Sequence, residues 1–142
     1  MESKTNTSMS QNLRIIIMDD EENIRDVLSM LLEFLGHTVS VSANGEELLK
    51  IYKESIDQGY PFDLVVMDLM ISNGMGGTET IKKLREFAPN VKVILSSGYH
   101  DSVSDNLLMN GFNGILRKPY DKNILNETIF GVINNQIHVN HD

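Results

Sequence analysis

Asp68 is the residue whose position in this sequence best suits it for chemistry. It directly follows the apolar run Leu64–Met67, which is typical of a buried strand. Ligands of open α/β sheets bind outside the carboxyl ends of the strands, so a carboxylate at this position would face a bound ligand. A single aspartate after a strand can also simply open a turn. The polar residues at the ends of the other strands decide between these two interpretations.

Four acidic residues in a row, Asp19-Asp20-Glu21-Glu22, follow the first apolar run, Leu13–Met18. One or two acids at this place could cap a helix, because the helix dipole favours negative charge at its N-terminus, but four exceed that need. A nucleotide-binding loop would present glycines and backbone amides to phosphate here. This loop would instead repel a bare phosphate and attract a hard cation. With Asp68 on a neighbouring strand, the carboxylates offer the oxygen ligands that Mg²⁺ prefers.

Two further polar residues stand at the ends of later strands, and each has an ordinary alternative. Ser97 lies in Ser96-Ser97-Gly98, and a serine is common where a strand passes into a loop. Lys118 precedes Pro119, and the residue before a proline avoids the helical region, so Lys118 stays at the strand end. A lysine there could be a surface residue. Beside the acidic cluster it would balance the charge and could later pair with a phosphoryl oxygen.

Strand-like runs alternate with amphipathic helices over nearly the whole chain. The expected strands are residues 13–18, 38–41, 64–68, 91–95 and 115–116. The expected helices carry apolar residues at helical spacing within residues 24–35, 48–56, 81–88, 103–108 and 124–133. This alternation predicts the α/β class, as a doubly wound parallel sheet with helices on both faces.

Length and composition bound the remaining possibilities. With 142 residues, the chain suits one domain, residues 13–136, with a disordered tail at 1–12 and a C-terminal tail at 137–142. Absence of cysteine excludes disulfides and thiolate chemistry, and the sequence has no apolar stretch long enough for a membrane span or a signal peptide. We therefore expect a cytoplasmic protein. A net charge of −8 argues against direct binding to nucleic acid or to an anionic membrane.

Two residue types are expected to have no chemical role. The four histidines form no cluster, and His37, like the others, is expected to be solvated. The eight methionines are expected to fill the core and not to bind a metal.

The polar residues at the strand ends, taken in order, resemble the receiver domain of two-component response regulators. The resemblance covers about Leu13 to Asn135 and depends on the ordered set, which is Asp19-Asp20, Asp68, Ser97-Gly98 and Lys118-Pro119. The segments 68–77 and 96–99 look closest to receivers of hybrid sensor histidine kinases. The resemblance implies a CheY-like, flavodoxin-like three-layer α/β/α fold of five helices and five parallel strands in the order 2-1-3-4-5.

The resemblance also implies a role for each site residue. Asp68 would accept a phosphoryl group from a phosphohistidine, and Asp19 and Asp20 would hold Mg²⁺ together with Asp68 and the Met70 carbonyl. Mn²⁺ could substitute for Mg²⁺. Ser97 and Lys118 would contact the phosphoryl oxygens. The peptide bond between Lys118 and Pro119 would be cis.

The implied function is phosphorelay signalling. The donor would be a sensor histidine kinase or a histidine phosphotransfer domain, and the chain would be a monomer or a weak dimer. Phosphorylation would change the surface formed by residues 103–108, the strand at 115–116 and the last helix. Such a protein is not an enzyme beyond the phosphotransfer and dephosphorylation at its own Asp68. A receiver-like interaction module that acts without phosphorylation is the alternative.

Three features depart from the receiver pattern. Family members usually have proline four residues after the phosphoacceptor, where this chain has Ser72. The turn that leads to Gly77 is one residue longer than the commonest form. Ile115 stands where receivers often have tyrosine or phenylalanine, so the usual aromatic rotamer switch cannot operate at this position.

Overall fold

The computed structural model describes residues 12–98, 111–135 and 138–139. The strands are β1 (Arg14–Met18), β2 (Thr38–Ser42), β3 (Leu64–Asp68), β4 (Lys92–Ser97), β5 (Gly114–Arg117) and β6 (His138–Val139). The helices are α2 (Glu22–Phe34), α3 (Gly45–Asp57), α4 (Gly77–Phe87) and α5 (Lys122–Ile133). The expected helix at 103–108 and the expected tail at 1–12, except for Asn12, lie outside the described residues.

The strands form one sheet in the order β2-β1-β3-β4-β5-β6, and every neighbouring pair is parallel. The expected order of the first five strands is confirmed. β6 is an addition, because the sequence interpretation assigned residues 137–142 to a tail. Gly114 and Ile115 of β5 pair with His138 and Val139 of β6. Two residues are too few to show an alternating pattern in the sequence, so β6 could not be expected.

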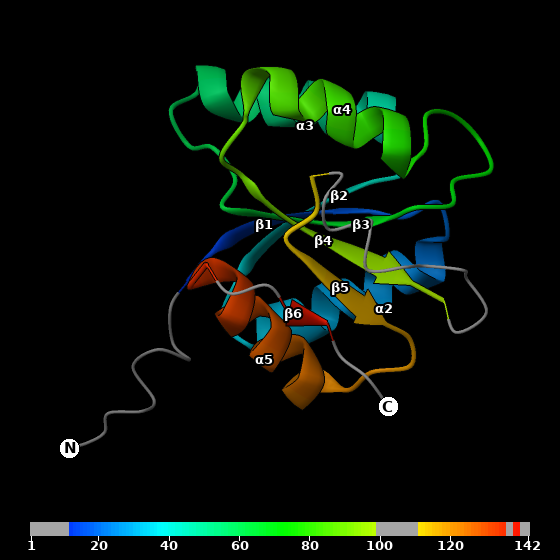
Figure 1. The fold of residues 1–142 in the computed structure, drawn as a ribbon, viewed down its shortest axis with the longest axis vertical. Helices are drawn as coiled ribbons and strands as arrows, with labels where there is room; N and C mark the ends of the chain where they lie inside the picture. Colours follow the sequence, from blue (N-terminus) through cyan, green and yellow to red (C-terminus); the bar gives the residue numbers. More distant parts are fainter. Residues whose placement is uncertain (1–11, 99–110, 136–137, 140–142) are drawn as a thin grey trace.

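The helices cover both faces of the sheet, as the doubly wound interpretation requires. In Figure 1, α3 and α4 lie on one face, and α2 and α5 lie on the other. Successive residues of a strand point to opposite faces, so β1 contributes to both cores. Ile16 and Met18 belong to the buried cluster under α3 and α4, whereas Ile15 and Ile17 belong to the cluster under α2 and α5.

Local sequence signals mark the starts of α3 and α5 and the end of α2. The Asn44 side chain caps α3 by accepting a hydrogen bond from Glu47 N at 3.0 Å, and Asp121 caps α5 in the same way from Ile124 N at 2.9 Å. Gly36 follows the end of α2 with φ of 98°, a left-handed conformation that favours glycine. None of the described helices has the length and apolar character that a membrane crossing requires.

Two expectations about side chains were wrong. His37 is only 8% exposed, and its Nδ1 accepts a hydrogen bond from Leu13 N at 3.2 Å, because the turn after α2 lies against the start of β1. Burial lowers the pKa of this imidazole. Met18 and Met67 fill the core as expected, but Met30 and Met70 are 68% and 65% exposed.

Candidate functional site

Asp68 ends β3, the strand that lies between β1 and β4. The sheet fixes the residues that lie beside this strand end. Asp68 pairs with Ser96 of β4, and the preceding residue, Met67, pairs with Met18 of β1. The Asp68 carboxylate is partly buried, and its Oδ1 accepts a hydrogen bond from Met70 N at 3.0 Å. The sheet therefore delivers this carboxylate to its carboxyl edge, where the two adjacent strands also end.

Asp19 is the buried member of the acidic run after β1. It is 3% exposed, its backbone N donates to Ser42 O at 3.1 Å, and its Oδ1 accepts from Glu21 N at 2.9 Å. Arg25 Nη1 donates to the carbonyl oxygen of Asp19 at 2.8 Å. These bonds fix the turn from β1 into α2 and hold the Asp19 carboxylate in place.

Asp20, the next residue, reaches the loop that follows β3. Its Oδ2 accepts a hydrogen bond from Ser72 N at 2.8 Å, across 52 positions of sequence. The side chain is partly buried. The turn after β1 and the loop after β3 are therefore joined by a direct bond at the edge of the site.

The Lys118 ammonium lies close to two carboxylates of the site. Its Nζ is 3.8 Å from Asp19 Oδ2 and 3.9 Å from Asp68 Oδ2, and the side chain is 27% exposed. Its backbone N donates to Ser97 O at 2.8 Å, which ties the ends of β4 and β5 together. The bond between Lys118 and Pro119 is cis, and this prediction is confirmed. The ammonium can balance both carboxylates, although ion pairs of this length and exposure are weak.

Ser97 ends β4 at the same edge and has no solvent exposure. Because Asp68 pairs with Ser96, Ser97 stands one position further along the neighbouring strand. Its hydroxyl donates to Gly98 O at 3.3 Å, among other interactions. The structure therefore brings Ser97 to the strand end beside Asp68, and the loop beyond Gly98 lies outside the described residues.

Carboxylate oxygens suitable for a cation gather after β1. One ligand oxygen from each of Asp19, Asp20 and Glu21 lies within 4.8 Å of the others. Carboxylates are the ligands that Mg²⁺ accepts in proteins, so this donor set fits the ion. Glu21 was not among the expected ligands, and its only signal was its place as third acid of the run. Asp68 is not part of this group of three and adjoins it through Lys118.

Gly77 is a second residue that the sequence interpretation did not assign to the site. A Cβ atom on Gly77 would lie 3.0 Å from Leu69 Cα and 3.1 Å from Asp68 O, both backbone atoms. Its N also donates to Leu69 O at 3.1 Å. The first residue of α4 therefore packs directly against the backbone of the candidate phosphoacceptor, and a side chain at this position would be in tight contact with that backbone.

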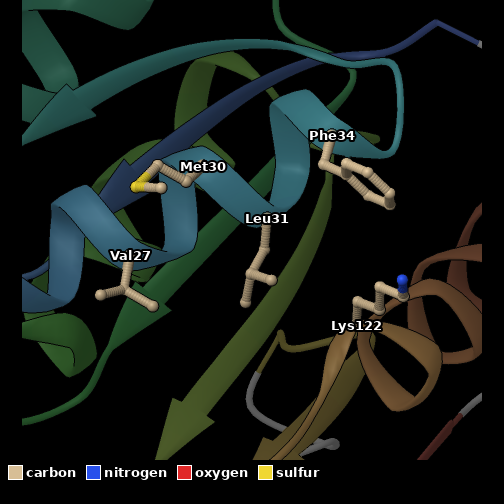
Figure 2. A pocket seen from close by; sticks show the side chains of 5 residues that line it. All are labelled: Val27, Met30, Leu31, Phe34 and Lys122. Carbon is tan, nitrogen blue, oxygen red and sulfur yellow. The ribbon is translucent and has the colours of Figure 1, made fainter.

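An apolar groove lies between α2 and the start of α5. Figure 2 shows its lining, and the groove has a volume of about 390 Å³. The lining residues are Val27, Met30, Leu31, Phe34 and Lys122. Lys122 Nζ lies 4.6 Å from the centre of the Phe34 ring, a cation–π distance.

A second hollow, of about 230 Å³, continues this groove towards the site. It shares Val27 and Leu31 with the groove and ends at Lys118, Pro119 and Tyr120. Burial raises the pKa of the Tyr120 hydroxyl to about 12, so the side chain stays neutral at ordinary pH. The apolar residues of α2 that line the groove and the hollow form one apolar strip, which leads to Lys118 beside Asp68. The residues of this strip are Ile24, Val27, Leu28, Met30, Leu31 and Phe34.

The family model and the similar proteins all point to one family. The model of the response regulator receiver domain matches residues 15–130 of this chain. Sensor kinase CckA of Brucella abortus (strain 2308) is 30% identical over 131 residues, which are 92% of this chain and 13% of that protein. The uncharacterized transcriptional regulatory protein YkoG of Bacillus subtilis (strain 168) is 36% identical over 109 residues, 75% of this chain and 45% of that protein. The chain thus spans less than half the length of either relative.

Solved structures agree with the sequence matches. A response regulator receiver domain protein from Clostridium thermocellum is 28% identical, with a TM-score of 0.75, and the match covers 86% of this chain and 94% of that one. A CheY-like receiver domain protein from Methanospirillum hungatei JF-1 is 30% identical, with a TM-score of 0.73, over 89% and 97% of the two chains.

Proposed function

Because the chain belongs to the family of response regulator receiver domains of two-component systems, we propose that Asp68 is its phosphoacceptor. The observation that carries this proposal is the position of the Lys118 ammonium, within 4.0 Å of both Asp19 and Asp68 at the carboxyl edge of the sheet. A cation at this place serves a reaction in which a carboxylate must approach a phosphoryl group of like charge. A turn-forming aspartate would need no such neighbour.

In the proposed reaction, an Asp68 carboxylate oxygen attacks the phosphorus of a phosphohistidine. A new O–P bond forms, the P–N bond breaks, and the imidazole leaves with the electron pair of that bond. The Met70 amide fixes the Asp68 carboxylate through Oδ1. Lys118 reduces the repulsion between the carboxylate and the phosphoryl oxygens, and Ser97 stands at the next strand end to receive one of those oxygens.

The same proposal assigns a divalent cation to the acidic cluster. Asp19 and Asp20 would hold Mg²⁺, or Mn²⁺ in its place, with Asp68 and the Met70 carbonyl as the further ligands that the family pattern supplies. Glu21 is an additional candidate because its carboxylate reaches the same group. When bound, the ion supplies positive charge that stabilises the transferring phosphoryl group.

The proposed donor is a sensor histidine kinase or a histidine phosphotransfer domain. A donor histidine has to be brought to Asp68 by a protein surface, and the apolar strip on α2 ends at Lys118. Val27, Met30 and Phe34 are each more than half exposed along this strip. We therefore expect the donor to lay an apolar helix face against α2, with its histidine directed to the site.

The proposed output is a change of protein–protein contacts and not a turnover reaction. Chemistry is confined to the phosphorylation and dephosphorylation of Asp68, and we expect it to take place in the cytoplasm. The phosphoryl group would draw in Ser97 and move the loop after β4. The surface expected to change includes β5, α5 and the segment 103–108, which lies outside the described residues.

Intact mass spectrometry tests the proposal directly. Incubation with acetyl phosphate and Mg²⁺ should add one phosphoryl group to the wild-type chain. Asp68→Asn, which keeps the size of the side chain, should add none, and removal of Mg²⁺ with a chelator should also abolish the addition. An unchanged mass of the wild-type chain with several donors would leave the interaction module that acts without phosphorylation.

A further inference from the structure

The loop between β3 and α4, residues 69–76, is bound directly to one of the candidate metal ligands. Ser72 N donates to Asp20 Oδ2 at 2.8 Å. The second oxygen of this carboxylate, Oδ1, accepts no hydrogen bond from the residues that the structure describes. A proline at position 72 could not make this bond because proline has no N–H. This chain can form the bond because position 72 is serine, which keeps the backbone N–H, and not the proline that is usual in the family.

The far end of the same loop is held by a second acidic side chain. Met75 N donates to Glu46 Oε1 at 2.8 Å, and Gly45 N donates to Met75 O at 2.9 Å. The bond from Met75 lowers the pKa of the Glu46 carboxyl, so the acceptor stays charged. Gly74 has φ of 108° and approaches Glu46 so closely that a Cβ there would lie 2.9 Å from Oε1. The loop is thus fixed between the start of α3 and the turn after β1.

A carboxylate that binds a cation works best when one of its oxygens is already held. An amide on Oδ2 limits the rotation of the Asp20 side chain, whose carboxylate belongs to the group formed with Asp19 and Glu21, and leaves Oδ1 for a cation. Without that bond, the Asp20 side chain would lose its rotational freedom when the ion binds, and this loss of entropy would weaken the binding. Because the loop is also fixed at Glu46, the amide donor is itself held in place.

We propose that the Ser72 amide is a positioning group for the metal site, which orients the Asp20 carboxylate for a divalent cation. This inference rests on the proposed function, since it assigns a partner to a ligand of the proposed Mg²⁺ site. The serine hydroxyl has no part in it. The contribution comes from the backbone N–H that proline would remove.

Two substitutions at one position separate the amide from the side chain. Ser72→Pro removes the N–H, and Ser72→Ala keeps it while removing the hydroxyl. We expect Ser72→Pro to weaken Mn²⁺ and Mg²⁺ binding about tenfold, measured by isothermal titration calorimetry, and Ser72→Ala to bind as the wild type does. Asp20→Ala should lose more affinity than Ser72→Pro. The melting temperature of each variant in metal-free buffer checks that the fold is intact.

A measurement on the wild-type chain covers the case in which Ser72→Pro does not fold. Ser72 is exposed, so solvent exchange of its amide, followed by NMR, reports on the bond to Asp20. We expect the amide to stay protected when Mg²⁺ saturates the protein.

Release of the amide on Mg²⁺ binding, or equal affinity of wild type and Ser72→Pro, would overturn the inference and leave the proposed function standing. A wild-type chain that binds no Mg²⁺ would overturn both the metal site and the inference, whereas a failed phosphorylation of Asp68 would count against the proposed function alone.

Discussion

Ile115 has no solvent exposure and belongs to the same buried cluster as Leu95 and Phe112. A β-branched side chain has few rotamers and no polar tip, so Ile115 can fill space beside Ser97's strand but cannot signal by swinging outwards. We predict that Ile115→Val lowers the free energy of unfolding by about 1 kcal/mol, because one buried methylene is lost. Urea denaturation measures this loss, and phosphorylation of Asp68 by acetyl phosphate should be unchanged.

Ile94→Val is the matched control for this prediction. Ile94 is equally buried but belongs to the cluster on the opposite face of the sheet. Both variants should lose similar stability and both should be phosphorylated. If Ile115→Val alone blocked phosphorylation, Ile115 would take part in the switch through its packing and would not merely fill space.

The turn that joins α2 to β2 contains a buried titratable group, His37. His37 Nδ1 accepts a hydrogen bond from Leu13 N, and its Nε2 is buried without a hydrogen-bond partner among the described residues. Burial disfavours the charged imidazolium and lowers the pKa in the folded state below the ordinary 6.5. The turn therefore has its full stability only while His37 is neutral.

We predict that the wild-type chain loses stability as pH falls from 7.5 through 6.5 to 5.5. In this window the unfolded state binds a proton at His37 more readily than the folded state does, so protonation favours unfolding. His37→Gln cannot titrate, and its free energy of unfolding should fall less steeply over the same window. Denaturant titrations at each pH give the free energy of unfolding of the wild type and of His37→Gln, and hence its slope against pH for each. The carboxylates and the other histidines contribute equally to both slopes. Parallel slopes would contradict the assignment of a buried, neutral His37.

The elements themselves could be predicted from the pattern of their apolar residues. The strand β3 is a continuous apolar run, as a strand buried on both faces requires, and the helix α3 has its apolar residues at helical spacing. Contacts between loops have no such period. The bond from Ser72 N to Asp20 depends on how two turns approach each other, and burial of His37 depends on the turn that carries it. The order of residues at the strand ends gave the candidate site, whereas Glu21 and Gly77 became visible only through distances.

The site lies where both helical layers meet the carboxyl edge of the sheet. The loop from β3 connects it to α3 and α4, and the apolar strip connects it to α2 and α5. The chain carries a net charge of −8, yet the strip is bordered by Lys118 and Lys122. In the proposed docking, a donor protein would meet an apolar surface with basic residues at its edge, on a chain of net negative charge.

This arrangement predicts that one surface substitution separates the two routes to phosphorylation. Met30 is 68% exposed on α2, so Met30→Ser should fold normally but remove apolar contact with a donor protein. We expect phosphotransfer from an autophosphorylated histidine kinase that phosphorylates the wild-type chain to become about tenfold slower, equivalent to about 1.4 kcal/mol of lost interaction. Phosphorylation by acetyl phosphate should be unchanged, because a small donor needs no docking surface.

Ile56→Ser, an exposed apolar position on α3 across the sheet, is the control and should leave both rates unchanged. If Met30→Ser left transfer from the kinase unchanged while Ile56→Ser slowed it, the donor would approach from the α3 side and the docking role of α2 would be wrong.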